Sequence, residues 1–109
     1  MTVSIHDFKK TLANIKEKNI RLKVKTYFGW SEHYLQIIGF VAAASSNDTA
    51  DFKGIVLSNI NATEGILINN ICSLIAFELE TGCEGLQPNV VYTLKDEANV
   101  GHEHMLVKN

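Results

Sequence analysis

Two histidines late in the chain are the residues whose type and spacing could most directly do chemistry. His102 and His104 flank Glu103. Residues two apart share a face of a β-strand, so both imidazoles could bind one metal ion. This is half a site, because no further ligand sits at a recognised spacing and the helical zinc motif needs histidines four apart. We therefore expect no metal site and no other cofactor. If the protein is a metal-dependent enzyme, His102 and His104 are the candidate ligands.

A basic segment early in the chain could bind phosphates. Four of its candidate residues lie at alternate positions of one predicted strand, and two lysines lie just upstream of it. The candidates are Lys16, Lys18, Arg21, Lys23, Lys25 and Tyr27. Cations interleaved with an aromatic ring suit a nucleic-acid backbone with one base stacked on the ring. The same pattern is typical of the solvated side of a half-buried strand, where lysines also discourage aggregation. Both interpretations stay open.

The two cysteines do not indicate a catalytic thiol. Cys83 lies between glycines in a segment expected to be an exposed loop, but the acidic neighbours Glu78, Glu80 and Glu84 would raise its pKa and disfavour the thiolate. Cys72 lies in an apolar run and is expected to be a small core residue. No phosphate-binding loop, serine nucleophile motif or paired-carboxylate signature is present. We therefore expect a protein that is not an enzyme.

Charge is distributed unevenly along the 109 residues. Residues 1–25 hold seven Lys and Arg against two acids, a net charge of +5, and the remainder has a net charge of −7. Such asymmetry is typical of a nucleic-acid face or of two complementary faces that meet in self-association. Trp30, in a predicted turn, would either cover the core or contact a protein partner.

Composition bounds the class of protein. Apolar residues make up 46% and charged residues 20% of the chain, as in a globular domain. No apolar run reaches the roughly 18 residues needed to span a bilayer, and the N-terminus lacks the features of a secretion signal. We therefore expect one domain over residues 1–109, no membrane association, a cytoplasmic location and reduced cysteines.

A helix over residues 4–18 would begin the fold. Ile5, Phe8, Leu12 and Ile15 recur at spacings of three and four and share one face. Ser4 is suited to cap its start, and Asn19 can adopt the left-handed conformation that ends a helix.

In the rest of the chain, segments that alternate apolar and polar residues or are rich in β-branched residues are separated by turn residues. From Arg21 to Phe28, Leu22, Val24, Thr26 and Phe28 would face the core. Gly39 is a candidate for a β-bulge or for a point of close backbone approach, and the polar segment 45–51 is expected to be a mobile loop. The predicted strands are 21–28, 34–43, 52–60, 66–68, 71–79, 90–94 and 104–107.

The segment 65–80, GILINNICSLIAFELE, fits a helix and a strand pair about equally well by period. Its isoleucines favour strands, and Asn69-Asn70 suits a tight turn between them. The predicted fold is therefore α+β and mostly β. An N-terminal amphipathic helix would be followed by an antiparallel meander of five to seven strands, as a small barrel or curled sheet.

The segment also carries a resemblance. Gly65, Ile66, Ile68, Asn69, Ile71 and Ile75, with Leu74 and Phe77 behind them, form a Gly-Ile-x-Ile-Asn-x-Ile pattern that resembles the closing motif of Sm-like and YolD-like small barrels. The Asp/Asn-Gly loops of true Sm proteins are missing. The resemblance implies a ring-forming or partner-binding barrel.

Three functions follow as expectations. The first is a small interaction or regulatory protein that acts through protein contacts, as a homo-oligomer or with a partner, of the kind a phage or mobile element encodes. The second is a nucleic-acid-binding barrel that uses the basic first strand. The third is a metal-dependent enzyme built on His102 and His104.

Overall fold

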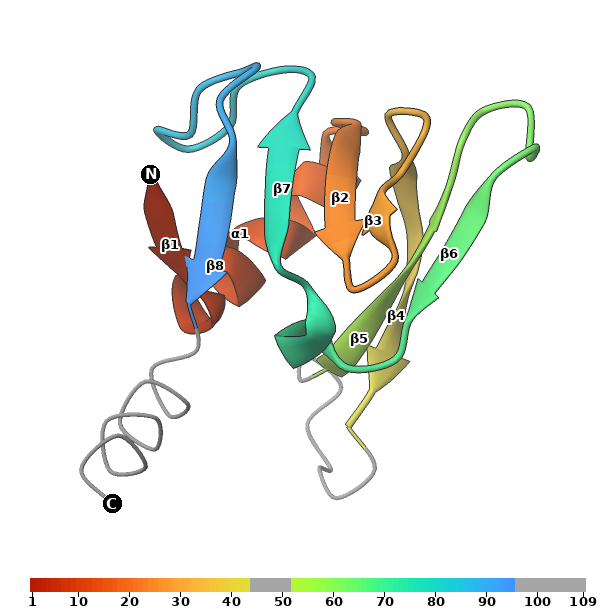
Figure 1. The fold of residues 1–109 in the computed structure, drawn as a ribbon, viewed down its shortest axis with the longest axis horizontal. Helices are drawn as coiled ribbons and strands as arrows, with labels where there is room; N and C mark the ends of the chain where they lie inside the picture. Colours follow the sequence, from red (N-terminus) through yellow and green to blue (C-terminus); the bar gives the residue numbers. More distant parts are fainter. Residues whose placement is uncertain (44–51, 96–109) are drawn as a thin grey trace.

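The computed structural model describes residues 1–43 and 52–95, which form one α-helix, one short 3₁₀-helix and eight strands (Figure 1). In chain order they are β1 (Thr2–Ser4), α1 (Ile5–Glu17), β2 (Leu22–Thr26), β3 (Gly29–Trp30), β4 (Gln36–Ala42), β5 (Phe52–Ser58), β6 (Gly65–Ile68), η1 (Ile71–Ser73), β7 (Ala76–Leu79) and β8 (Tyr92–Lys95). The predicted strand 104–107 and the segment 45–51 lie outside the described residues.

The strands form two sheets. One has the order β1-β8-β7-β2-β3 and the other β4-β5-β6. The mostly-β class with one N-terminal helix is confirmed. Within residues 1–43 and 52–95 the two sheets do not close into a barrel, and only β4-β5-β6 is a simple antiparallel meander. The other sheet departs from a meander because β1 pairs with β8 in parallel.

Helix α1 forms as the sequence predicts. Ser4 is the N-cap, and its side-chain oxygen accepts a hydrogen bond of 3.0 Å from the backbone N–H of Asp7. Asn19 has a φ of 55°, the left-handed conformation that lets the chain leave the helix. The residues that α1 buries are the four that its spacing indicated: Ile5, Phe8, Leu12 and Ile15.

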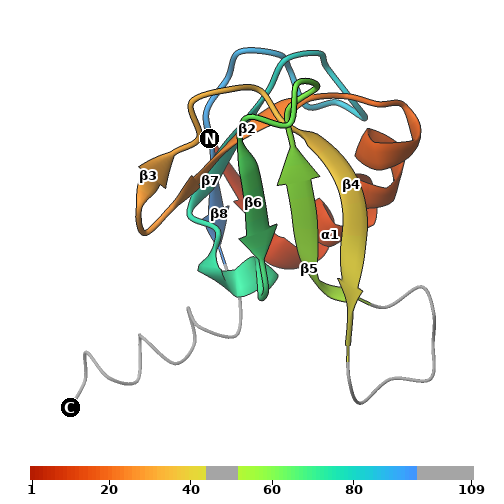
Figure 2. The ribbon, with the colours of Figure 1, turned by 90° about the vertical axis from the view of Figure 1, so that its right-hand side faces the viewer.

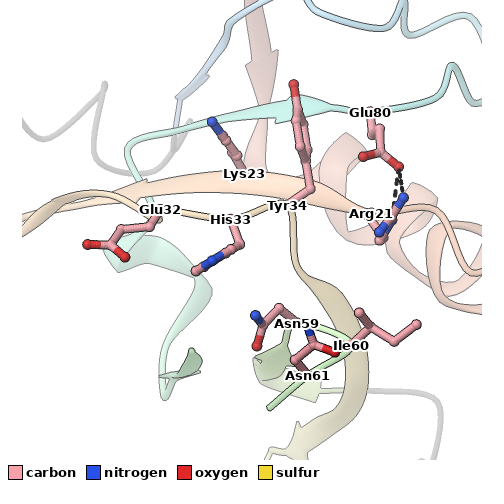
Figure 3. Close-up of a pocket in the computed structure, with 9 residues that line it drawn as sticks. All are labelled: Arg21, Lys23, Glu32, His33, Tyr34, Asn59, Ile60, Asn61 and Glu80. Atoms are coloured by element: carbon pink, nitrogen blue, oxygen red, sulfur yellow. Dashed lines mark hydrogen bonds and ion pairs between the residues drawn. The ribbon is translucent and has the colours of Figure 1, made fainter. Parts of the chain in front are cut away.

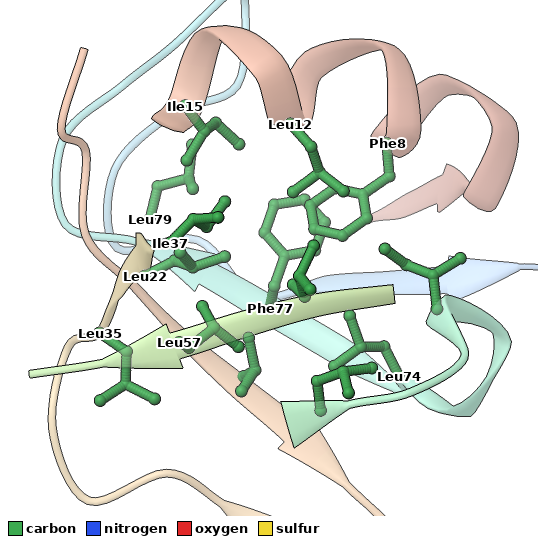
Figure 4. Packing of buried hydrophobic residues seen from close by; sticks show 14 of the residues in the cluster. Phe8, Leu12, Ile15, Leu22, Leu35, Ile37, Leu57, Leu74, Phe77 and Leu79 are labelled. Carbon is green, nitrogen blue, oxygen red and sulfur yellow. The ribbon is translucent and has the colours of Figure 1, made fainter. Parts of the chain in front are cut away.

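The helix packs against both sheets and closes one side between them. It contacts β1 and β8 of the larger sheet and β4 of the smaller one (Figure 2). Phe8 stacks on Phe77 of β7 at 4.4 Å between ring centroids, and Phe77 stacks on Tyr92 of β8 at 5.3 Å. Figure 4 shows this cluster continuing through the apolar side chains between the sheets. One core therefore joins the helix to both sheets.

The first predicted strand ends early. The alternation from Leu22 holds through Val24, but the chain reverses after Thr26, where Gly29 has a φ of 105°. Phe28, expected inside, is 95% exposed in the turn. Gly29-Trp30, expected in a turn, instead forms β3, which pairs with the end of β2. The prediction for Phe28 was wrong because period-two alternation cannot show where a chain turns back.

The segment 65–80 is two strands and not one helix, as predicted. The interval between them was predicted wrongly, because Ile71–Ser73 is a 3₁₀-helix. Asn70 begins that helix by accepting a 2.9 Å hydrogen bond from the N–H of Cys72. The turn carries the chain from the smaller sheet (β6) to the larger one (β7).

The remaining predicted strands are found with shorter or shifted bounds. The predictions 34–43, 52–60 and 90–94 correspond to β4, β5 and β8. The register shift between Ile37 and Gly39 confirms the expected bulge. β1 was not anticipated, because a three-residue strand leaves little periodic signal. In the described part of the chain, no helix is long and apolar enough to cross a membrane.

Candidate functional site

The predicted basic residues are divided among different surroundings. Arg21 and Lys23 line a polar groove of about 340 Å³ (Figure 3). The other residues of this polar groove are Glu32, His33, Tyr34, Asn59, Ile60, Asn61 and Glu80. Lys16 lies in the last turn of α1 and Lys18 caps it, so neither lines the polar groove.

Acidic side chains offset the charge in the polar groove. Arg21 forms an ion pair of 2.6 Å with Glu80. The Lys23 ammonium lies 5.1 Å from the centre of the Tyr34 ring. The Tyr34 hydroxyl donates a hydrogen bond of 2.5 Å to Glu78, directly across from Lys23 in the β2–β7 register. This hydrogen bond, with burial and the charges of Glu78 and Glu80, raises the pKa of Tyr34. The first strand is therefore a mixed-charge surface at this end.

Glu64 ties the two sheets together beside the polar groove. Its carboxylate accepts hydrogen bonds of 2.9 Å from the backbone N–H groups of Glu32 and His33, and it lies 2.9 Å from His33 Nδ1. Burial acts to raise the pKa of Glu64, but the two N–H donors and the imidazole outweigh it and lower the pKa. Glu64 directly precedes β6, and Glu32 follows β3. This contact therefore clamps one end of β3 to one end of β6.

A second, apolar groove lies beyond this clamp. It has a volume of about 180 Å³ and runs between the β2–β3 turn and strand β6. The residues of this apolar groove are Thr26, Tyr27, Phe28, Ile66, Leu67, Ile68 and Ser73, none of which is charged.

Large apolar side chains are presented to solvent at the apolar groove. Tyr27 is 89% exposed, Phe28 95% and Leu67 62%. The Tyr27 and Phe28 rings pack edge to face at 5.6 Å. Trp30, 40% exposed on the neighbouring strand, pairs with Lys25. Of the predicted site residues, Lys25, Tyr27 and Trp30 are thus grouped near this groove.

The apolar surface continues over the outer face of the smaller sheet. Leu67 pairs with Val56, and Val56 pairs with Gly39 beside the exposed Ile38. Alternation places these side chains opposite Ile55, Leu57 and Ile68, which are buried in the core.

The thiols are placed the opposite way from the prediction. Cys72, expected in the core, is exposed, and Cys83, expected to be exposed, is buried. Burial, with a smaller effect of Glu84, raises the pKa of Cys83 despite the nearby Lys18. A buried thiol with a raised pKa is a poor nucleophile.

The metal hypothesis rests on His102 and His104, which lie outside the described residues. Among residues 1–43 and 52–95, no three His, Cys, Asp or Glu side chains gather as a metal site would require.

Comparison with family models, with characterised proteins and with solved structures finds no match to this chain. The motif that resembled small barrels is placed by the structure in three elements. Gly65 to Ile68 form β6, Ile71 lies in η1, and Phe77 lies in β7 of the other sheet. The motif therefore connects two sheets.

Three residues of this region were not singled out from the sequence: Phe28, Glu64 and Leu67. Phe28 was assigned to the core because it continued the alternation of β2. Glu64 stood in a predicted turn without any sign of its backbone partners 31 and 32 residues away. Only the Gly at position 29, which permits the reversal, signals that Phe28 is at a turn.

Proposed function

We propose that this protein is a non-enzymatic interaction module that binds a protein partner through the apolar groove and the exposed side chains around it. The observation that carries the proposal is the presence of two almost fully exposed aromatic rings, Tyr27 and Phe28, beside an uncharged groove and Leu67. Soluble monomers rarely present apolar side chains in contiguous groups unless the patch binds something.

The size of the surface is adequate for such a role. An aromatic side chain can bury about 150–250 Å². Tyr27 and Phe28 together could thus supply roughly half of the ~800 Å² that each partner contributes to a standard interface. Leu67, Val56 and Ile38 extend the same apolar surface across the smaller sheet. Aromatic residues at the centre of an interface commonly dominate its binding energy.

The experiment compares partner capture by three versions of the full chain. Cross-linking in cells is followed by mass spectrometry for the wild type, Phe28→Ser, and the control Ile60→Ser. Ile60 is 82% exposed but lines the polar groove, so its substitution removes a comparable apolar side chain elsewhere. We expect one specific partner with the wild type and Ile60→Ser, and at least a tenfold loss with Phe28→Ser. Equal capture by all three versions would refute a role for the apolar groove.

Binding of single-stranded nucleic acid is the second candidate function. It is favoured by the grouping of Lys25 with the exposed rings of Tyr27 and Trp30. It ranks second because Glu80 pairs with Arg21 and Glu78 lies across from Lys23. Titration of labelled single-stranded RNA and DNA at low salt discriminates the two: tight, salt-sensitive binding lost in Lys25→Gln would favour nucleic acid.

Self-association and a cytoplasmic location complete the proposal. Unequal charge along the sequence supports contact between a basic N-terminal region and an acidic remainder of a second copy. Light scattering tests this contact, because an oligomer held by charge should dissociate as salt is raised.

A further inference from the structure

The two sheets have free edges that face the same opening. β3 is an edge strand of the larger sheet, and β6 is an edge strand of the smaller sheet. Among the described residues, β3 pairs only with β2, and β6 pairs only with β5. Figure 1 shows β3 and β6 on the same side of the molecule, running in opposite directions. Helix α1 closes the other side, near β4 and β8. The sheets are thus covered on one side and open on the other.

The clamp and the apolar groove define the shape of this opening. Glu64 joins the loop after β3 to the start of β6 at 2.9 Å. Further along β6, Ile66–Ile68 and the β2–β3 turn are separated by the apolar groove. The opening is therefore closed at the Glu64 end and open at the Phe28 end.

An edge strand carries backbone groups that are ready to pair. In an antiparallel pair, alternate residues direct their N–H and C=O groups away from the partner strand. At the outer edge of β6 these groups face the opening, where an added strand could use them. Strand β6 has four residues, so it could pair with about 13 Å of extended chain.

We infer that the apolar groove binds one extended, uncharged peptide segment of a partner protein, which adds to β6 as a fourth strand of the smaller sheet. This inference rests on the proposed function and specifies its binding mode. The alternate side chains of the added strand would contact Tyr27 and Phe28, and its backbone would pair with Ile66–Ile68.

The absence of charge in the apolar groove decides which occupant it suits. All seven residues that line the apolar groove are uncharged, and Lys25 stands next to Thr26 without lining it. A phosphate-bearing or strongly acidic segment inside the groove would therefore lose its hydration without gaining a charged partner from the lining. An apolar segment complements such walls. The Glu64 clamp holds the loop after β3 to the start of β6, so an added strand would enter from the Phe28 end and pair with Ile66–Ile68.

The first test uses the full chain without a ligand. Amide hydrogen exchange, followed by NMR, should show fast exchange for the amides of Ile66–Ile68 that point away from β5. The amides of the central strand β5 should exchange at least tenfold more slowly. Uniform protection across β6 would mean that this edge is already occupied, by another segment of the chain or by a second copy, and would overturn the inference.

The second test uses a displayed library of random nine-residue peptides, selected on the immobilised full chain. We expect enriched peptides with apolar residues at alternate positions and no proline at their centre. Their affinity should fall at least tenfold in Phe28→Ser and in Leu67→Ser, and change less than twofold in Ile60→Ser. Circular dichroism of each variant verifies that it is folded. On binding, the amide signals of residues 65–68 and 26–30 should shift.

The outcomes separate the inference from the proposed function. If no peptide is enriched while Phe28→Ser still abolishes partner capture, the strand-addition mode fails and protein binding stands. If no peptide is enriched and Phe28→Ser captures the partner as well as the wild type does, the strand-addition mode and the proposed protein binding both fail. A dimer of the wild type that Phe28→Ser dissociates would replace the peptide with a second copy. Enrichment of helical or strongly charged peptides would also overturn the inference.

Discussion

At the scale of single residues, Gly54 shows how closely the backbone approaches itself in the smaller sheet. It lies buried in the middle of β5, a position where glycine normally weakens a strand. A Cβ atom at Gly54 would overlap the carbonyl oxygen of Ile68 and lie 2.7 Å from that of Asn69. The end of β6 can therefore cross over β5 only where a side chain is missing.

The variant Gly54→Ala should accordingly lower the free energy of unfolding by about 3 kcal/mol, because a rigid backbone must move to admit the methyl group. Gly39→Ala is the matched control in β4, where an added Cβ meets nothing within 4 Å. The control should change stability by no more than about 0.5 kcal/mol. Urea unfolding of both variants measures the difference, and equal losses would contradict the close approach.

Glu64 is the residue that connects β3 to β6, and its effect should depend on pH. Its folded-state pKa is below its ordinary value of 4.5, so its contribution to stability is present above that pH and is lost as the pH falls through the lowered pKa. Glu64→Gln should lower the free energy of unfolding by about 1–2 kcal/mol at pH 7.

The difference between wild type and Glu64→Gln should narrow as the pH is taken below 4.5, where wild-type Glu64 is progressively protonated. Glu32→Gln is the control, because the exposed Glu32 contributes its backbone N–H to the clamp. Urea titrations from pH 3 to 7 measure the free energy of unfolding of the wild type, Glu64→Gln and Glu32→Gln. A difference that stays constant with pH would show that the carboxylate charge is not what holds the clamp.

At the scale of elements, the sequence predicted what local patterns determine. Helix α1 was predicted closely because four apolar residues at helical spacing follow a capping serine. The bulge at Gly39 was predicted because glycine is common where a strand departs from regular pairing. The two-strand nature of residues 65–80 followed from isoleucines around an asparagine pair.

What depends on distant contacts could not be predicted in the same way. Strand β1 exists because Thr2–Ser4 pair with Thr93–Lys95, far along the chain. The apolar groove combines residues of the β2–β3 turn with residues of β6, so no single window of sequence contains it. Cys72 was predicted in the core but is exposed because a 3₁₀ turn interrupts the predicted strand at 71–79. Cys83 was predicted to be exposed but is buried in the core, in a turn that pairs it with Leu86.

At the scale of the whole molecule, Phe77 links the helix to the larger sheet. It is fully buried between Phe8 of α1 and Tyr92 of β8. Phe77→Ala should lower the free energy of unfolding by about 3–5 kcal/mol, because it leaves a cavity where three elements meet. Phe77→Leu, which retains most of the volume, should cost less than about 1.5 kcal/mol.

Two probes would follow the same unfolding transition. Trp30 is the one tryptophan of the chain and reports on β3, while far-ultraviolet circular dichroism is dominated by α1. Because a single core joins these elements, the two transitions should coincide in the wild type. A helix signal that melts first in the wild type would show that α1 is only loosely held by Phe77.

The parallel pairing of β1 with β8 has a consequence for how the protein is made in the cell. Thr2 is synthesised before its partner, Thr93, which follows roughly 5 to 20 s later at ordinary rates of translation. During that interval the nascent chain carries Phe8 and the apolar side of α1 without strand β8, which helps to cover them in the folded protein. The larger sheet can therefore be completed only after β8 has been synthesised, and until then the apolar side of α1 depends on other parts of the chain for cover.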